Sequence, residues 1–375
     1  MYSIRIVQEK NEFYDLKAAW NALFEDSVHK EISLTWEWLY TWWEIFCEGC
    51  NLFIIVVMFD ECVVGIAPLL FRERKKIGIT TKCIELLGSG EDLEDEICSD
   101  YLGFILKKGQ EEVSSQKIFE YILSSPSQWD EINLKDIFED SSEFKVFKKC
   151  INDDYKYSVE YRTKCPFVEL PKQWDEFLAG SKKRKKHIKV RINTLNRVGN
   201  VSYECVKDKN KVLELFPEII RLHQLRWESA GHPGCFSSYK FTSFHKELIL
   251  RFFGDRFAQV EFLKIDNEYV ACWYYFKCKD RLYAYLSGCI TDKYESIGLG
   301  SALTIFSIRQ AISDGIKYYD YYKGKKGSYK YQWASGDRIL VGINVFNSKK
   351  WKSRFIGCAC QIRRKLTKIK NRLIK

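Results

Sequence analysis

Residues 52–70 read LFIIVVMFDECVVGIAPLL, and residues 259–276 read QVEFLKIDNEYVACWYYF. Each segment has an apolar run rich in β-branched and aromatic residues, a short acidic turn and a second such run. This combination predicts a β-hairpin. When the two segments are aligned, Asp60 matches Asp266 at the turn. The chain therefore contains the same hairpin twice.

The sequence before each hairpin is also repeated. A strand-like segment, at residues 1–7 and again at 201–206, is followed by two stretches in which apolar residues recur at helical spacing. The order β-α-α-β-β thus occurs twice, which favours an internal duplication over a chance match. We expect an α/β (α+β) protein of two related halves, residues 1–160 and 161–348. Each half is expected to hold a mixed, mostly antiparallel sheet flanked by helices.

The composition is that of a globular protein. Of 375 residues, 46% are hydrophobic and 15% aromatic, which is enough to form a large packed core. No apolar run approaches the length of a membrane span, and residues 1–10 lack the apolar core of a signal peptide. The simplest expectation is a cytoplasmic protein with reduced cysteines. We expect no metal, because Cys47 and Cys50 have no second pair and no nearby histidine.

The basic charge of the chain is concentrated at residues 349–375. This tail has eleven Lys or Arg and no acidic residue, and the rest of the chain holds 49 basic and 50 acidic residues. Its apolar residues recur at helical spacing, which predicts a basic amphipathic helix. We favour peripheral contact with an anionic membrane surface over a helix docked on the body. The nearly neutral body predicts no DNA partner.

The segment YESIGLGSA, residues 294–302, lies between a predicted strand at 281–288 and a predicted helix at 299–313. Glycines let a backbone approach a ligand closely, and free N–H groups at a helix start attract anions. The segment therefore predicts a pyrophosphate site. The alternative is an ordinary helix start that contains glycine.

A second group of candidate residues lies in DYYKGKKGSYKYQW, residues 320–333. Asp320 ends a predicted strand, where open α/β sheets place ligands. Its carboxylate is suited to take a proton from an amine, and the Tyr329 phenol to protonate a leaving thiolate. Lys330 is suited to neutralise a phosphate or an oxyanion. The alternative is a tyrosine-rich strand followed by a solvated loop.

Two helical segments add further candidates. In LHQLRW, residues 222–227, His223 lies one turn from Arg226 and Trp227, which is consistent either with a site wall or with a rim around a packed Trp. Residues 182–197 contain eight basic side chains and no acidic one. This run is suited to bind phosphates, and a solvated helix face explains it equally well.

These motifs resemble those of the GNAT acyltransferase superfamily. Residues 294–302 resemble its acyl-CoA pyrophosphate loop, with Glu295 where the family has Gln or Arg. Residues 222–227 and 320–333 resemble the His-x-x-Arg-Trp and Asp-Phe-x-x-Gly-x-x-x-Tyr-Lys-x-x-Trp motifs of the CelD/BcsL-like branch, which is related to FemAB-type transferases. The resemblance covers most of the chain and implies tandem GNAT-like domains with an acyl-CoA co-substrate.

The resemblance and the residue chemistry together imply a set of site residues. The catalytic candidates are Asp320, Tyr329, Lys330 and His223. The candidates for binding the co-substrate are Ile297, Gly298, Leu299, Gly300 and Ser301. The candidates for binding the acceptor are Arg226, Trp227, Tyr331, Trp333 and Arg191.

We expect N-acyl transfer, with acetyl the first choice, from acyl-CoA to an amine such as an amino sugar used in polysaccharide or envelope synthesis. Direct attack by the amine requires no nucleophilic cysteine. One alternative is FemAB-like aminoacyl transfer from tRNA to a peptidoglycan precursor, and the absence of a sustained heptad repeat makes a tRNA partner the weaker expectation. Another is a non-catalytic, membrane-associated assembly protein that has kept the fold.

Overall fold

The computed structural model describes residues 1–151, 155–252, 254, 256–294 and 297–359. The chain divides into two compact units. The first comprises Met1–Gly90, Cys98–Arg162 and the chain from Ile339 onward, and the second comprises Glu91–Ile97 and Thr163–Arg338. Strands β9 (Tyr155–Glu169) and β15 (Gly336–Asn347) each run from one unit into the other. The chain thus returns to the first unit before residue 348, where the sequence suggested the second half would end.

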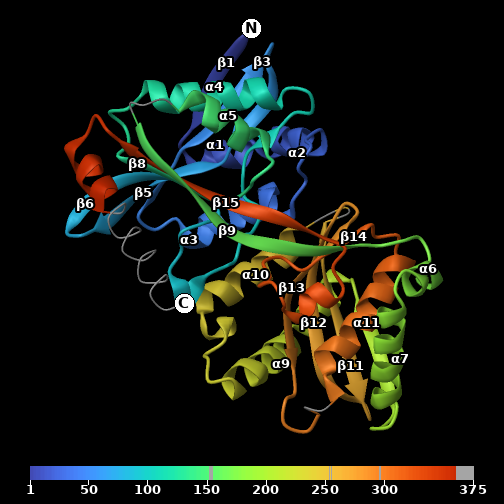
Figure 1. Cartoon of the computed structure of the whole chain (residues 1–375). Helices are drawn as coiled ribbons and strands as arrows, with labels where there is room; N and C mark the ends of the chain where they lie inside the picture. The colour runs from blue at the N-terminus through green and yellow to red at the C-terminus, as the bar shows by residue number, and fades with distance from the viewer. Residues whose placement is uncertain (152–154, 253, 255, 295–296, 360–375) are drawn as a thin grey trace, which may run out of the picture. The chain divides into compact units, whose positions relative to one another are not determined.

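The repeated order of elements is confirmed (Figure 1). In the first unit, β1 (Tyr2–Val7), α1 (Lys10–Asp15), α2 (Lys17–Glu25) and α3 (Trp36–Phe46) precede the hairpin of β3 (Ile54–Phe59) and β4 (Cys62–Ala67). In the second unit, β10 (Val201–Val206), α8 (Lys209–Glu214), α9 (Phe216–Ser229) and α10 (Tyr239–Arg251) precede the hairpin of β11 (Phe257–Ile265) and β12 (Glu268–Cys278). In both units, the opening strand pairs antiparallel with the first strand of the hairpin.

The two hairpins also share their backbone geometry. Asp60 and Glu61 have φ of 44° and 66°, and Asp266 and Asn267 have φ of 50° and 67°. Positive φ at both central residues is the type I′ turn, whose twist matches that of paired strands. Each hairpin also has a register shift at the same distance before its turn. The duplication is therefore visible in backbone detail.

The remaining elements of the first unit extend this core. They are β2 (Cys50–Leu52), β5 (Leu69–Lys76), β6 (Ile79–Leu86), β7 (Ile105–Leu106), α4 (Glu111–Ser124), β8 (Glu131–Phe138) and α5 (Ser142–Cys150). Strands β1, β3, β4 and β7 form one sheet in the order β1-β3-β4-β7. Strand β8 pairs with β6 and with β15, and β5 joins β6 to β2.

The second unit is a sheet with helices on both faces (Figure 1). Its strand order is β10-β11-β12-β13-β14-β9, with β13 at Arg281–Cys289 and β14 at Tyr318–Asp320. Helices α7 (Lys182–Leu195) and α11 (Leu299–Ser313) cover one face of the sheet, and α9 and α10 lie on the other. The short helix α6 (Trp174–Ala179) precedes α7 in the chain. The core beneath α11 is mainly apolar and aromatic, and it includes Trp273, Leu303 and Ile308. The 3-10 turn η5 (Tyr329–Gln332) precedes β15.

The sheet of the second unit opens between β13 and β14. Only three residue pairs join the two strands, and the last is Tyr283 with Asp320. Residues 284–289 of β13 continue past the end of β14. Helix α9 packs tightly on this part of β13, because a Cβ at Gly288 would overlap the backbone of Leu222 and His223. Glycine at position 288 thus allows α9 to approach the sheet at the point where β13 loses its partner.

No helix of the described residues is long and apolar enough to span a membrane. The described cysteines are free thiols, as expected. The predicted tail helix is partly visible, since residues 351–359 are helical, whereas its continuation lies outside the described residues. The same holds for Glu295 of the predicted phosphate loop.

Replacement of Gly288 by alanine should destabilise the protein by about 1–3 kcal/mol or more, because the new methyl group would meet the backbone of α9 rather than a movable side chain. Gly300→Ala is the matched control, since no atom lies within 4 Å of a Cβ built there. Denaturant unfolding of both variants measures the effect. Equal stability of the two variants would contradict the close approach of α9.

Candidate active site

The start of α11 has the properties of an anion site. Gly298 is the residue before the helix and has φ 64° and ψ 60°, a left-handed conformation that favours glycine. The N–H groups of Leu299 and Gly300 have no acceptor within the helix, as for any helix start. The first turn contains no acidic residue. The helix dipole and these N–H groups therefore favour a bound anion.

The corresponding helix of the first unit, α4, lacks these properties. Its first turn carries Glu111 and Glu112, and the Glu111 carboxylate accepts a hydrogen bond from the N–H of Gly109 at 2.9 Å. The negative charge of these carboxylates disfavours a bound phosphate at this helix start. Of the two equivalent helices, only α11 is suited to an anionic ligand.

One face of α7 lies against the start of α11. Arg184, His187 and Arg191 recur at the spacing of a single helix face. Arg191 donates a hydrogen bond to the carbonyl of Ile297, and His187 Nε2 lies 3.2 Å from the Ser301 hydroxyl. Burial, and to a lesser degree Arg191, lowers the pKa of His187. The basic helix and the glycine segment, about a hundred residues apart in sequence, therefore form one structure.

Two guanidinium groups on this face have unmet hydrogen-bonding capacity. The Nε atoms of Arg184 and Arg191 are buried and have no acceptor among the described residues. A buried donor without an acceptor is costly, and a charged one more so. A bound anion would remove that cost, so the arrangement fits the phosphates of a ligand.

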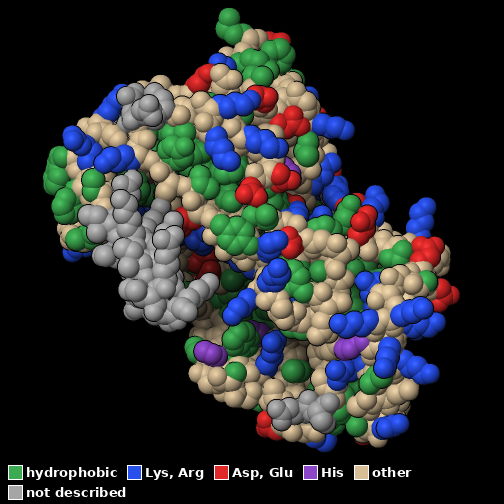
Figure 2. Space-filling view, viewed as in Figure 1, with side chains coloured by type: hydrophobic (Ala, Val, Ile, Leu, Met, Phe, Trp, Pro, Cys, Tyr) green, Lys and Arg blue, Asp and Glu red, His purple; other side chains and the backbone are tan. Residues whose placement is uncertain are grey.

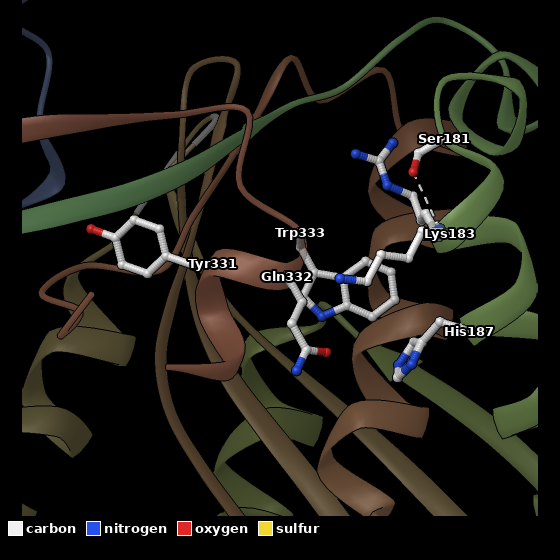
Figure 3. A pocket seen from close by; sticks show the side chains of 7 residues that line it. Ser181, Lys183, His187, Tyr331, Gln332 and Trp333 are labelled. Atoms are coloured by element: carbon white, nitrogen blue, oxygen red, sulfur yellow. Dashed lines mark hydrogen bonds between the residues drawn. The ribbon is translucent and has the colours of Figure 1, made fainter. Parts of the chain in front are cut away.

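A cavity of about 340 Å³ lies beside these groups (Figure 3). Helix α7 contributes Ser181, Lys183, Arg184 and His187 from one side, and the chain at η5 contributes Tyr331, Gln332 and Trp333 from the other. The His187 ring meets the buried Trp333 ring edge-on, with their centroids 5.5 Å apart. We call this space the donor cavity.

A second cavity, of about 240 Å³, lies along the free part of β13. It brings together five residues that the sequence analysis selected from two distant motifs, namely His223, Arg226, Trp227, Tyr329 and Lys330. Trp273, Tyr285 and Ser287 complete much of its wall. We call it the acceptor cavity. The turn η5 contributes to both cavities, which are therefore neighbours within the second unit.

The hydrogen bonds around His223 determine the tautomer of its imidazole. The Gln224 amide nitrogen donates to the Pro233 carbonyl at 2.7 Å, which turns the Gln224 oxygen toward His223 Nδ1 at 3.2 Å. Nδ1 must then carry the proton, and Nε2 has the lone pair. The Cys235 thiol lies 3.4 Å from Nε2. Burial lowers the pKa of His223 to about 4, with Arg226 contributing, so the ring is neutral at pH 7.

Tyr329 remains protonated at neutral pH. Burial raises the pKa of its phenol, and the positive charge of Arg226 partly opposes this effect. The Arg226 guanidinium is held in place by the Ser287 hydroxyl at 2.7 Å. The acceptor cavity thus combines a neutral base, a neutral acid and a cation.

Asp320 does not lie on either cavity. It is completely buried, and its carboxylate pairs with Arg281 at 2.9 Å and Arg338 at 2.6 Å. Its second oxygen accepts the N–H of Tyr322 at 2.8 Å. In this arrangement the carboxylate binds the end of β14 to its neighbours and has no access to a substrate in either cavity.

Lys330 also bonds within the protein. Its ammonium donates to the carbonyls of Tyr321 and Lys323 at 2.7 and 2.6 Å and so closes the loop before η5. The sequence placed Arg184 and His187 in the basic run suited to bind phosphates but did not single them out beside Arg191, whose helical spacing they share, and it gave Gln224 no role. The described residues contain no group of three or more His, Cys, Asp or Glu placed to hold a metal.

Asp320→Asn should destabilise the protein by about 3–5 kcal/mol, because it leaves the partly buried Arg281 and Arg338 without their anion. Asp337→Asn is the control, since its more exposed pair with Lys164 should contribute under about 1 kcal/mol. Equilibrium unfolding measures both variants. A fully stable Asp320→Asn protein would rule out this structural role.

Gln224→Glu should raise the pKa of His223 by about 1–3 pH units, because a carboxylate beside Nδ1 favours the imidazolium. Gln224→Met removes the acceptor and should weaken the preference for the Nδ1–H tautomer. Nitrogen-15 NMR of the histidine rings reads both the pKa and the tautomer. An Nε2–H tautomer in the unaltered protein would show that the assigned hydrogen bonds are wrong.

Comparisons with known proteins agree with this geometry. A family model described as an acetyltransferase (GNAT) domain matches residues 182–332, which include the acceptor cavity and the lining of the donor cavity except Ser181 and Trp333. The crystal structure of FemX has 13% sequence identity and a TM-score of 0.59, covering 92% of this chain and 98% of that one. The C-terminal domain of a putative lysylphosphatidylglycerol synthetase from Agrobacterium fabrum has 9% identity and a TM-score of 0.56, covering 94% and 96%.

A search of curated proteins found no match. At these identities the solved structures show a common fold, which here extends over both units. Residues 182–332 therefore match a GNAT acetyltransferase domain, and the chain as a whole shares its fold with FemX and with the lysylphosphatidylglycerol synthetase domain.

Proposed function

We propose that this protein is an acyl-CoA-dependent N-acyltransferase. The observation that supports this most is the pair of buried, acceptor-free Nε atoms of Arg184 and Arg191 beside the start of α11. Acyl-CoA carries a pyrophosphate that matches such a site, and the GNAT family uses this co-substrate. In the proposal, the phosphates bind at residues 297–301 and the thioester extends to the gap between β13 and β14.

The acceptor amine then binds in the acceptor cavity. Its lone pair attacks the thioester carbonyl, so that a C–N bond forms, the C–S bond breaks and CoA leaves as the thiolate. His223 lines the cavity and is unprotonated at pH 7, so its Nε2 takes the proton from the amine, which replaces the Cys235 thiol that lies 3.4 Å from this atom. The protonated Tyr329 phenol supplies a proton to the thiolate.

Asp320 and Lys330 act as positioning residues in this proposal. Both hold the segment that precedes η5, Asp320 through two arginines and Lys330 through two carbonyls. Their contacts place Tyr329 in the wall of the acceptor cavity. Acetyl is the first donor to test, and the amine of an amino sugar is the first acceptor to test.

We also propose that the protein acts at an anionic membrane surface through residues 349–375. In the described part of this tail, Trp351 and Phe355 are 69% and 53% exposed and have basic neighbours in the sequence. Large exposed aromatic side chains next to Lys and Arg are typical of helices that lie at a membrane interface. A lipid-linked acceptor would be reached from such a position.

A second candidate function is aminoacyl transfer from tRNA. It is supported by the whole-chain fold likeness to FemX and to the lysylphosphatidylglycerol synthetase domain. It is also supported by the outer face of α7, where the exposed residues Lys182, Lys185, Lys186 and Lys189 have no acidic partner among the described residues. Figure 2 shows basic side chains gathered over this helix. The phosphate backbone of a tRNA would suit this basic face of α7.

Arg191→Gln and Arg184→Gln should each weaken binding of acetyl-CoA about 10-fold or more, because each removes a charged donor to a phosphate. Arg197→Gln is the control, since Arg197 is exposed just beyond the end of the same helix. Thermal shift and calorimetry measure binding, and thiol release with amino sugars measures turnover. Stabilisation that grows with acyl-CoA concentration is the expected result.

Two outcomes would overturn the proposal. Binding of aminoacyl-tRNA, steeply weakened by salt, with no response to acyl-CoA would establish the second candidate function. No response to acyl-CoAs of any chain length, and none to tRNA, would favour a non-catalytic protein that has kept the fold.

A further inference from the structure

The wall of the acceptor cavity contains an arginine that pairs with no Asp or Glu of the described part of the chain. Arg226 lines the cavity, and its hydrogen bonds go to the Ser287 hydroxyl and carbonyl at 2.7 and 3.4 Å. No Asp or Glu of the described residues pairs with it, and none lines the cavity. Ser287 thus holds the guanidinium in place and leaves its remaining N–H groups for a ligand.

The charge of Arg226 acts on the groups that surround the cavity. It lowers the pKa of His223 and opposes the burial effect on the pKa of Tyr329, so it lies close to both. Other arginines in this unit do have carboxylate partners, as Arg221 has Glu218 and Arg281 has Asp320. Arg226 is thus placed to bind an anion that is not part of the protein.

The spacing of Arg226 and His223 restricts that anion. The two residues are three apart on α9, so their Cβ atoms are separated by about 5–6 Å on one helix face. Trp227 and Tyr329, which are 38% and 39% exposed, add aromatic surface at the cavity. Such rings bind the apolar faces of rigid ligands at low entropic cost.

We infer that the acceptor is an amine that carries an anionic group, a carboxylate or a phosphate, about one helical turn away from its nitrogen. The amine binds at His223 Nε2 and the anion at Arg226. This inference rests on the proposed function, in which His223 receives the proton of the amine. It narrows the acceptor class and excludes simple polyamines.

A competing anionic surface lies on the same unit. The Tyr285 hydroxyl, in the cavity wall, donates to the carbonyl of Ile97, and Asp95 accepts from the Ser238 hydroxyl. These bonds hold the acidic segment Glu91–Ile97 near the cavity, with Asp92, Glu94 and Glu96 exposed. If that segment selected the acceptor, cationic amines would be preferred.

The test compares matched acceptors with the full-length protein. Glucosamine 6-phosphate is set against glucosamine, and 5-aminovalerate against cadaverine. Binding is measured by calorimetry in the presence of CoA, and turnover by thiol release from acetyl-CoA. Each anionic acceptor should bind roughly 10- to 100-fold more tightly than the matched acceptor that lacks the anion. Whether the phosphate or the carboxylate compound binds better identifies the anion.

Arg226→Gln should abolish this preference by weakening the binding of the anionic acceptors roughly 10- to 100-fold, so that they bind no more tightly than their matched acceptors without the anion. Arg221→Gln, on the same helix and paired with Glu218, should leave the preference intact. Equal binding of charged and uncharged acceptors, or a preference for cadaverine, would overturn the inference. Charge-selective binding without thiol release would overturn the proposed function and leave the anion site standing.

Discussion

The contact of α9 with β13 at Gly288 is the constraint on which the acceptor cavity depends. Helix α9 approaches so closely that its backbone, at Leu222 and His223, occupies the space of a side chain. This contact occurs on the part of β13 that has no β14 beside it. His223 and Arg226 therefore border the opening in the sheet. A larger residue at position 288 would move the whole helix, and the candidate base and the candidate anion site with it.

The donor side depends on a different principle, which is the placement of positive charge that no carboxylate among the described residues neutralises. The start of α11 offers N–H groups and a favourable dipole, and the inner face of α7 adds two guanidinium groups with free buried nitrogens. The duplicated first unit shows the opposite solution, because Glu111 and Glu112 neutralise the same end of α4. Both halves therefore keep the hairpin, and the second half alone keeps a helix start suited to bind a phosphate.

Asp320 and Lys330 illustrate where residue type and role diverge. Both belong to the motif that carries the strongest family resemblance, and both have side chains capable of proton transfer or charge stabilisation. In the structure their charges are used within the protein, by two arginines and by two backbone carbonyls. Tyr329, from the same motif, is the residue that borders a cavity. The motif thus builds the site mainly by fixing the shape of the segment before η5.

The sequence alone determined the hairpin at Asp60 and Asp266, the order of elements in both halves and the helix that starts after Gly298, because periodicity and turn chemistry are local properties. It also identified His223, Arg226 and Tyr329, which the fold brings to one cavity from motifs about a hundred residues apart. Only the tertiary structure decided which charged groups are already neutralised within the protein. It joined Arg184 and His187 to the phosphate segment, gave Asp320 two arginine partners and left Arg226 without a carboxylate partner among the described residues. Such pairing depends on distances between segments remote in sequence, and hydrophobic patterning does not encode it.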